Sequence, residues 1–188
     1  MAGQDDSYLR ALVVHLWRLF YRRVPANAAL WAVVQVAAGY AGHRMSPPVF
    51  RRAAWLLRPR PIERDGRFYE EALHIRRWKG RLPEAGAVFP GGFDKSRIAG
   101  RDPAYLCKFI RETERAELAH WLALVPTPLF VRYNPRLVAV CMPVYALAVN
   151  APCIAAQRYN RIRLTRVLVR RTGPAGSPPP APAAPWAR

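Results

Sequence analysis

The chain has 188 residues, with 30 lysines and arginines against 12 aspartates and glutamates and a formal net charge of +18. This excess predicts an anionic partner, which could be nucleic acid, a membrane surface or a phosphorylated ligand. Apolar residues make up 52% of the chain and fall in long blocks, a pattern that disfavours a nucleic-acid-binding domain. The three cysteines form no CxxC pair and have no histidine at ligand spacing, so we expect neither a disulfide framework nor a metal site.

The N-terminal stretch YLRALVVHLWRLFYRR combines a basic side with an apolar side at helical spacing. Arg10, His15, Arg18 and Arg22 share one side when successive residues are turned by about 100°. This pattern predicts an amphipathic helix over residues 1–24 that lies in the lipid headgroup layer.

Two later blocks are long and uncharged, at residues 26–42 and 137–156. A helix needs roughly 20 apolar residues to cross a bilayer, so both blocks are candidate spans, with the second the stronger. A shorter apolar piece at 119–131 contains Pro126 and Pro128, which favour a tilted or re-entrant segment. We predict a small, mainly α integral membrane protein with two to three membrane-inserted helices, rather than buried helices of a soluble protein.

Charge and proline content complete the predicted organisation. The basic segments 43–118 and 157–171 are expected on the cytoplasmic side of a multi-pass protein in the cell membrane, by the positive-inside rule. The Pro- and Ala-rich residues 172–188 predict a disordered tail. Residues 25–171 would then form the membrane domain.

The stretch 103–121 has strong helical character, with Asp102 and Pro103 at its start. One face begins with apolar residues and then carries Glu117 and His120, which lie within reach of each other. A carboxylate that holds one imidazole nitrogen leaves the other able to remove a proton from a hydroxyl. The pair therefore predicts a catalytic site, although mutual satisfaction at a helix contact explains it equally well. Arg115 points to the opposite face, with Glu112 as its expected partner.

A second polar cluster follows the last apolar block. Gln157, Arg158, Asn160 and Arg161 follow one another closely there, and Asn150 interrupts the block itself. Arginines at this place are typical of a membrane anchor, whereas the added amides favour a phosphate-binding site. The sequence RRWKGRLP contributes Trp78 and Lys79, which suit a basic patch at the membrane interface.

Three stretches together resemble one family. RRWKGRLP, FIRETERAELAHW and YALAVNAPCIAAQRYNRIRL are similar to the glycosyl-4,4'-diaponeurosporenoate acyltransferases of the staphyloxanthin carotenoid pathway, in the family's order. The resemblance covers roughly Trp31 to Arg171. It implies a membrane enzyme that moves a fatty acyl group from an activated thioester, such as acyl-CoA, to a sugar hydroxyl of a glycosylated carotenoid or related glycolipid.

Combining the resemblance with the chemistry of the residues gives a specific hypothesis. His120 would act as general base, oriented by Glu117, and the substrates would contact nine further residues. Expected partners are membrane lipids, the acceptor and the thioester co-substrate, without a cofactor, a metal or nucleic acid. The alternative is a non-enzymatic membrane anchoring or assembly protein with a basic lipid-binding face. The nine predicted substrate-binding residues are Trp78, Lys79, Glu112, Arg115, Asn150, Gln157, Arg158, Asn160 and Arg161.

Overall fold

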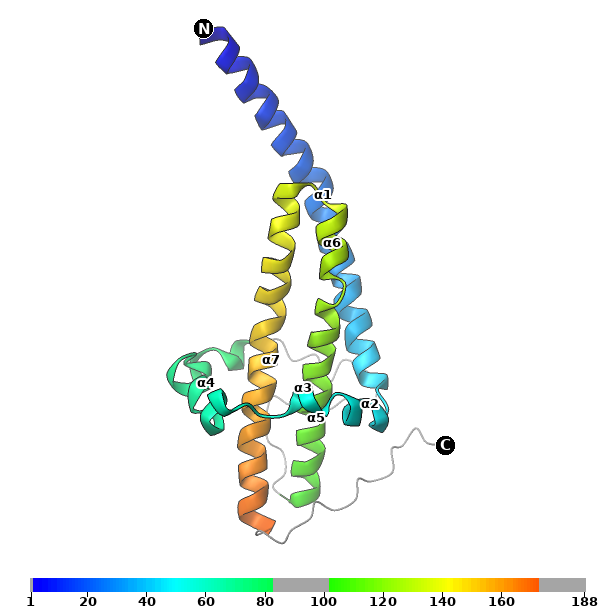
Figure 1. Cartoon of the computed structure of the whole chain (residues 1–188), viewed down its shortest axis with the longest axis vertical. Helices are drawn as coiled ribbons and strands as arrows, with labels where there is room; N and C mark the ends of the chain where they lie inside the picture. Colours follow the sequence, from blue (N-terminus) through cyan, green and yellow to red (C-terminus); the bar gives the residue numbers. More distant parts are fainter. Residues whose placement is uncertain (1, 83–101, 173–188) are drawn as a thin grey trace.

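The computed structural model describes residues 2–82 and 102–172, and this part of the chain forms helices and no strand. Three long helices dominate it: α1 (Ala2–Arg44), α5 (Pro103–Leu124) and α7 (Arg136–Thr172) (Figure 1). The mainly α class expected from the sequence is therefore confirmed. The shorter helices are α2 (Pro47–Arg52), α3 (Ala54–Leu57), η1 (Pro61–Gly66), α4 (Arg67–Glu71), η2 (Ile75–Arg77), η3 (Lys79–Arg81) and α6 (Thr127–Tyr133).

Helix α5 begins where its sequence predicts. The side chain of Asp102 accepts a hydrogen bond from the backbone N–H of Tyr105 at 2.9 Å, and Pro103 occupies the first helical position, where no backbone donor is needed. The helix ends shortly before Pro126, and α6 continues in nearly the same direction (Figure 1). The apolar piece at 119–131 therefore completes the end of α5 and forms most of α6.

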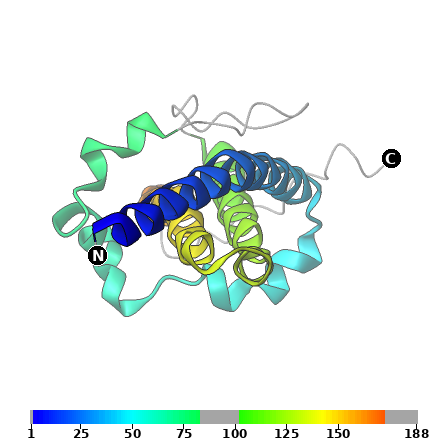
Figure 2. The same cartoon turned by 90° about the horizontal axis from the view of Figure 1, so that it is seen from above.

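The three long helices pack as a bundle in which α5 runs opposite to α1 and α7 (Figures 1 and 2). The contact between α5 and α7 is the most extensive, and α1 covers α5. Gly42 permits the close approach of α1, because an added Cβ there would lie 2.8 Å from Cβ of Ala119. Pro143 and Pro152 lie within α7, which continues through both.

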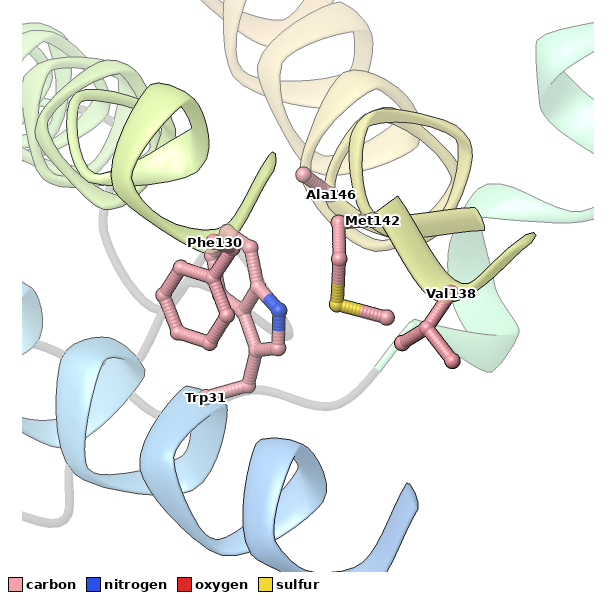
Figure 3. Close-up of a cluster of buried hydrophobic side chains, with 5 residues drawn as sticks. All are labelled: Trp31, Phe130, Val138, Met142 and Ala146. Carbon is pink, nitrogen blue, oxygen red and sulfur yellow. The ribbon is translucent and has the colours of Figure 1, made fainter. Parts of the chain in front are cut away.

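Two kinds of contact join the helices near the turn between α6 and α7. Trp31 is almost completely buried and stacks on Phe130 with ring centroids 4.3 Å apart, beside Val138, Met142 and Ala146 of α7 (Figure 3). Asn27 of α1 and Asn134 exchange reciprocal side-chain hydrogen bonds of 2.9 Å. The apolar contact fills the interface, and the paired amides satisfy polar groups that would otherwise be costly there.

Within the described part of the chain, two helices are long and apolar enough to cross a membrane: α1 over Tyr21–Arg44 and α7. Large apolar side chains on both face outward, with Val33 63% exposed and Val140 69% exposed. These surfaces are apolar although no protein covers them, as expected of helices in lipid. The two helices correspond to the predicted spans at 26–42 and 137–156.

Between α1 and α5 the chain makes a lateral excursion that runs from α2 to η3 (Figure 2). Residues 67–78 do not form one continuous helix, because α4 ends at Glu71 and His74 adopts a left-handed φ of 45°. Gly66 has a φ of 95° and lies against Tyr159 and Ile162 of α7. This glycine allows the excursion to turn close to the bundle.

The remaining predictions concern the two ends of the chain and the domain limits. The predicted disordered tail at 172–188 lies beyond the described residues, apart from Thr172 at the end of α7. Helix α1 is continuous across the boundary placed at residue 24. The interfacial position of residues 1–24 and the proposed domain limits stay predictions.

Candidate active site

Four buried charged residues form an ion-pair core between α5, α7 and η1. The carboxylate of Glu117 is fully buried; its Oε1 accepts a hydrogen bond of 2.7 Å from Nη1 of Arg158, and its Oε2 lies 2.6 Å from Nη2 of Arg161. Nε of Arg158 also donates to Oε1 of Glu63 at 2.8 Å. Two carboxylates therefore face two guanidinium groups, and this pairing makes their burial tolerable.

The same guanidinium groups hold the end of α3. Arg158 donates to the backbone carbonyls of Leu56 and Arg58, each at 2.9 Å, and Arg161 donates to the carbonyl of Leu57 at 2.8 Å. Carbonyls at the end of a helix have no partner within it, so these bonds satisfy them. Most donors of the predicted phosphate-binding pair Arg158 and Arg161 are thus engaged within the protein.

A second polar cluster joins His120, Asn150 and Gln35 from the three long helices. Nδ1 of His120 lies 3.0 Å from Oδ1 of Asn150, which also accepts a hydrogen bond of 3.3 Å from Nε2 of Gln35. Asn150 is fully buried, and its Nδ2 donates to the carbonyl of Ala146 at 2.9 Å, which assigns the orientation of its amide. Because Oδ1 can only accept, the hydrogen-bonded Nδ1 of His120 carries a proton.

This tautomer has a chemical consequence. A neutral His120 with hydrogen on Nδ1 carries its lone pair on Nε2, as a general base requires. The sequence hypothesis gave the orienting role to Glu117, whereas the structure places Asn150 at Nδ1. Glu117 lies one helical turn away, where its Oε1 also accepts a hydrogen bond of 3.2 Å from Nε1 of Trp121.

A third cluster surrounds the buried side chain of Tyr159. Its hydroxyl donates to Oε1 of Glu70 at 2.7 Å and accepts from Nε of Arg76 at 3.0 Å. The hydroxyl of Tyr159 lowers the pKa of the Glu70 carboxyl, and the charge of Arg76 lowers it further. These hydrogen bonds connect α4 and η2 to α7.

The predicted patch at Trp78 and Lys79 belongs to this third cluster. Nζ of Lys79 donates to Oδ1 of Asn160 at 2.7 Å and lies 5.0 Å from the centroid of the Tyr159 ring. Burial and nearby arginines lower the pKa of Lys79. Nε1 of Trp78 donates to the carbonyl of Leu73 at 2.8 Å. Trp78 thus has a structural partner within the lateral excursion, and Lys79 has its partners on α7.

The remaining predicted residues lie around these clusters. Arg115 and Glu112 form the expected ion pair, at 3.4 Å. Gln157 is partly buried, and its Oε1 has no hydrogen-bond partner among the described residues. Within residues 2–82 and 102–172, no group of three histidine, cysteine or acidic side chains is placed to hold a metal ion.

Sequence reasoning did not select Gln35, Glu63 or Glu70. Gln35 could have been predicted as a polar contact between helices, because it is an amide within an uncharged apolar stretch and such a group needs a hydrogen-bond partner in the bundle. Glu63 and Glu70 carried none, because acidic residues in a polar, arginine-rich segment are ordinarily exposed.

A cavity of about 630 Å³ lies between the lateral excursion and the adjoining parts of α5 and α7. Five arginines and three acidic residues contribute to its lining, together with apolar side chains that include Phe50, Leu57 and Ile110. Arg161 is shared between this cavity and the ion-pair core.

These features describe a helical protein with membrane-length apolar helices and a histidine–amide cluster built around the buried Asn150. Comparison with known proteins places it among the acyltransferases. Residues 53–170 match the family model described as glycosyl-4,4'-diaponeurosporenoate acyltransferase. The chain belongs to this family, as its sequence resemblance indicated. Because this is a family of acyltransferases, the chain is an enzyme, and the alternative of a non-enzymatic anchoring protein is not supported.

Individual relatives agree with the family model. Proteins named glycosyl-4,4'-diaponeurosporenoate acyltransferase from Staphylococcus aureus strains USA300 and Newman are each 32% identical over 138 residues, which cover 73% of this chain and 83% of theirs. The protein of that name from strain MRSA252 is 31% identical over the same length. Comparison with solved structures produced no match.

Proposed function

We propose that this acyltransferase moves a fatty acyl group from an activated thioester, such as acyl-CoA, to a sugar hydroxyl of a glycosylated carotenoid or related glycolipid. The names of the relatives support the glycosylated carotenoid acceptor. The apolar surfaces of α1 and α7 support an enzyme that crosses the membrane, and the arginine-rich excursion would lie on the cytoplasmic side. Membrane lipids would surround the exposed apolar side chains.

The hydrogen bond between His120 and Asn150 is the single observation that carries the mechanism. Nε2 of His120 takes the proton from the acceptor hydroxyl as its oxygen attacks the thioester carbonyl. A carbon–oxygen bond forms, the carbon–sulfur bond breaks, and the departing thiolate takes up the proton. General-base catalysis of this kind contributes typically about 10²–10⁴-fold.

Asn150 and Glu117 have distinct roles in this proposal. Asn150 is a positioning residue, because it holds Nδ1 of His120 and thereby selects the tautomer. Glu117 supports the site through the ion-pair core one turn away. The amide of Gln157 or Asn160 would donate a hydrogen bond to the carbonyl oxygen of the thioester, which becomes negatively charged as the hydroxyl attacks.

The test compares glycolipids and pigments, by mass spectrometry, in cells that carry the native gene, no gene, or the variant His120→Gln. We expect the acylated product to fall by at least about 100-fold with His120→Gln, while the variant still reaches the membrane. His74→Asn is the control, because His74 is exposed and asparagine tolerates its left-handed backbone. Full product formation by His120→Gln would overturn the assigned chemistry.

Asn150 provides a second test of the same proposal. Replacing it with leucine removes the acceptor at Nδ1 of His120 and should lower kcat more than it raises KM, because the substrate contacts are left in place. A purely structural role would instead lower the amount of folded enzyme without changing the kcat of the folded fraction.

A further inference from the structure

The cavity beside the ion-pair core carries a strong excess of positive charge. Arg58, Arg60, Arg64 and Arg166 lie on its exposed rim, and Arg161 lies on its buried side. Arg161 is already balanced by Glu117. The lining contains three acidic residues, Glu63, Asp65 and Glu114, and Glu63 is already paired with Arg158. The cavity therefore attracts anions.

A buried donor gives a second and independent indication of a ligand. The side chain of Arg161 is only 6% exposed, and its Nη1 has no hydrogen-bond partner among the residues that the structure describes. Buried guanidinium donors are normally satisfied. An acceptor oxygen bound in the cavity that Arg161 lines would complete its hydrogen bonding.

The walls of the cavity suit a ligand that is not only an anion. Phe50, Leu57 and Ile110 add apolar surface beside the arginines. A volume of about 630 Å³ is within the range of organic ligand sites. Phosphate oxygens on the arginines and an organic ring on the apolar wall would use both kinds of surface, since guanidinium groups bind phosphate in a bidentate manner.

We propose that this cavity binds the phosphate-bearing head of the acyl donor, with Arg58, Arg60, Arg64 and Arg166 on its rim and Arg161 on its buried side. Arg158, which was predicted to act beside Arg161, is instead held within the ion-pair core. The assignment rests on the proposed function for the identity of the donor. Glu114 on the cavity wall precedes His120 by six residues, or about 9 Å along α5. A donor with a flexible arm between its phosphates and its thioester would span this distance.

The experiment measures binding of unacylated coenzyme A to the full-length protein in detergent micelles by titration calorimetry. The double variant Arg64→Gln with Arg166→Gln should weaken this binding at least 10-fold. Glu114→Gln should strengthen it, because one negative charge leaves the cavity wall. These opposite signs exclude general misfolding as the cause. The control is Arg132→Gln with Arg136→Gln, exposed arginines at the distant end of the bundle, which should leave binding unchanged.

Two further probes distinguish the source of the phosphate. Inorganic pyrophosphate should compete with coenzyme A, whereas micelles that contain phosphatidylglycerol should not. Displacement of coenzyme A by phosphatidylglycerol, with loss of lipid binding in the double arginine variant, would assign the cavity to a lipid headgroup and overturn the donor proposal. Equal affinity of all variants for coenzyme A, or no binding to the native protein, would also overturn it.

The binding experiment is independent of the catalytic mechanism. His120→Gln should bind coenzyme A as the native protein does, whether or not it retains activity. A failure of the His120 mechanism would thus leave the binding result intact, and a failure of the cavity proposal would leave the role of His120 open to its own test.

Discussion

Arg158 on α7 donates a 2.7 Å hydrogen bond to Glu117 on α5, and the glutamate carboxylate is completely shielded from solvent. Arg161 binds the other oxygen of the same carboxylate. Removing one member of a buried charge pair leaves its partner uncompensated, typically at a cost of about 3–5 kcal/mol. We therefore expect Glu117→Gln to lower the free energy of unfolding by this amount, measured by denaturant titration in micelles.

Glu112→Gln is the matched control for Glu117→Gln. It removes the same charge from the same helix, but Glu112 forms a longer 3.4 Å pair with Arg115 and remains partly exposed. Its loss should cost no more than about 1 kcal/mol. Similar losses in the two variants would show that the ion-pair core does not hold α5 and α7 together.

The close approach of Gly42 to Ala119 leads to a second prediction. Gly42→Ala would place two methyl carbons 2.8 Å apart, so α1 and α5 must separate. Overpacking of this kind costs about 1–3 kcal/mol, which a thermal unfolding experiment would detect. The added change Ala119→Gly should recover most of the loss, and Gly80→Ala, which meets no atom within 4 Å, should be neutral. Lack of recovery would place the cause elsewhere.

Tyr159 should control the attachment of the lateral excursion. Tyr159→Phe removes the hydroxyl that bonds Glu70 and Arg76, and we expect a loss of about 1–3 kcal/mol. Cleavage by trypsin after Arg76 and Arg77 should become faster. Tyr133→Phe serves as the control, because Tyr133 is 75% exposed. Unchanged cleavage in Tyr159→Phe would mean that apolar packing alone holds this segment.

Glu114 gives a prediction about pH. Burial raises the pKa of its carboxyl above the ordinary value of 4.5, Glu117 raises it further, and Arg161 and Arg111 act in the opposite direction. Ionisation at neutral pH is therefore harder in the folded chain than in the unfolded one, so it destabilises the fold. Glu114→Gln should be more stable than the native protein at neutral pH, with the gain disappearing as the pH falls below about 4.5.

The measurement compares the free energy of unfolding of the Glu114→Gln variant with that of the native protein across this pH range. The exposed Glu71→Gln variant corrects for the general effect of removing a negative charge from a basic protein. A gain that persists at low pH would contradict the assigned cause.

Local patterns were sufficient to predict much of the fold. The start of α5 at Pro103 follows from the capping chemistry of Asp102, and the two candidate spans follow from uncharged length. The polar face that carries Glu117 and His120 also follows from helical spacing. These features depend on residues a few positions apart, so the sequence contains them directly.

The partners of the polar residues were harder to predict. Glu117 was paired with His120, three residues away, because no spacing rule could bring Arg158 to it from another helix. In a buried position two guanidinium groups neutralise a carboxylate better than a neutral imidazole can, and the packing of α5 on α7 supplies them. An amide such as that of Asn150 inside an apolar helix needs a hydrogen-bond partner, but the identity of that partner depends on how α5 and α7 are aligned.

The reciprocal amide pair of Asn27 and Asn134 has a consequence for how α1 sits against its neighbours. Apolar surfaces slide past each other at little cost in lipid, so they define alignment poorly. Gln35 and Asn150 form another such link eight residues further along α1. Sliding by a single turn would break both links at once, so the two amide pairs fix the position of α1 along α7 and the turn that precedes it. A helix that served only to anchor the chain in the membrane would not need a fixed alignment along its neighbours.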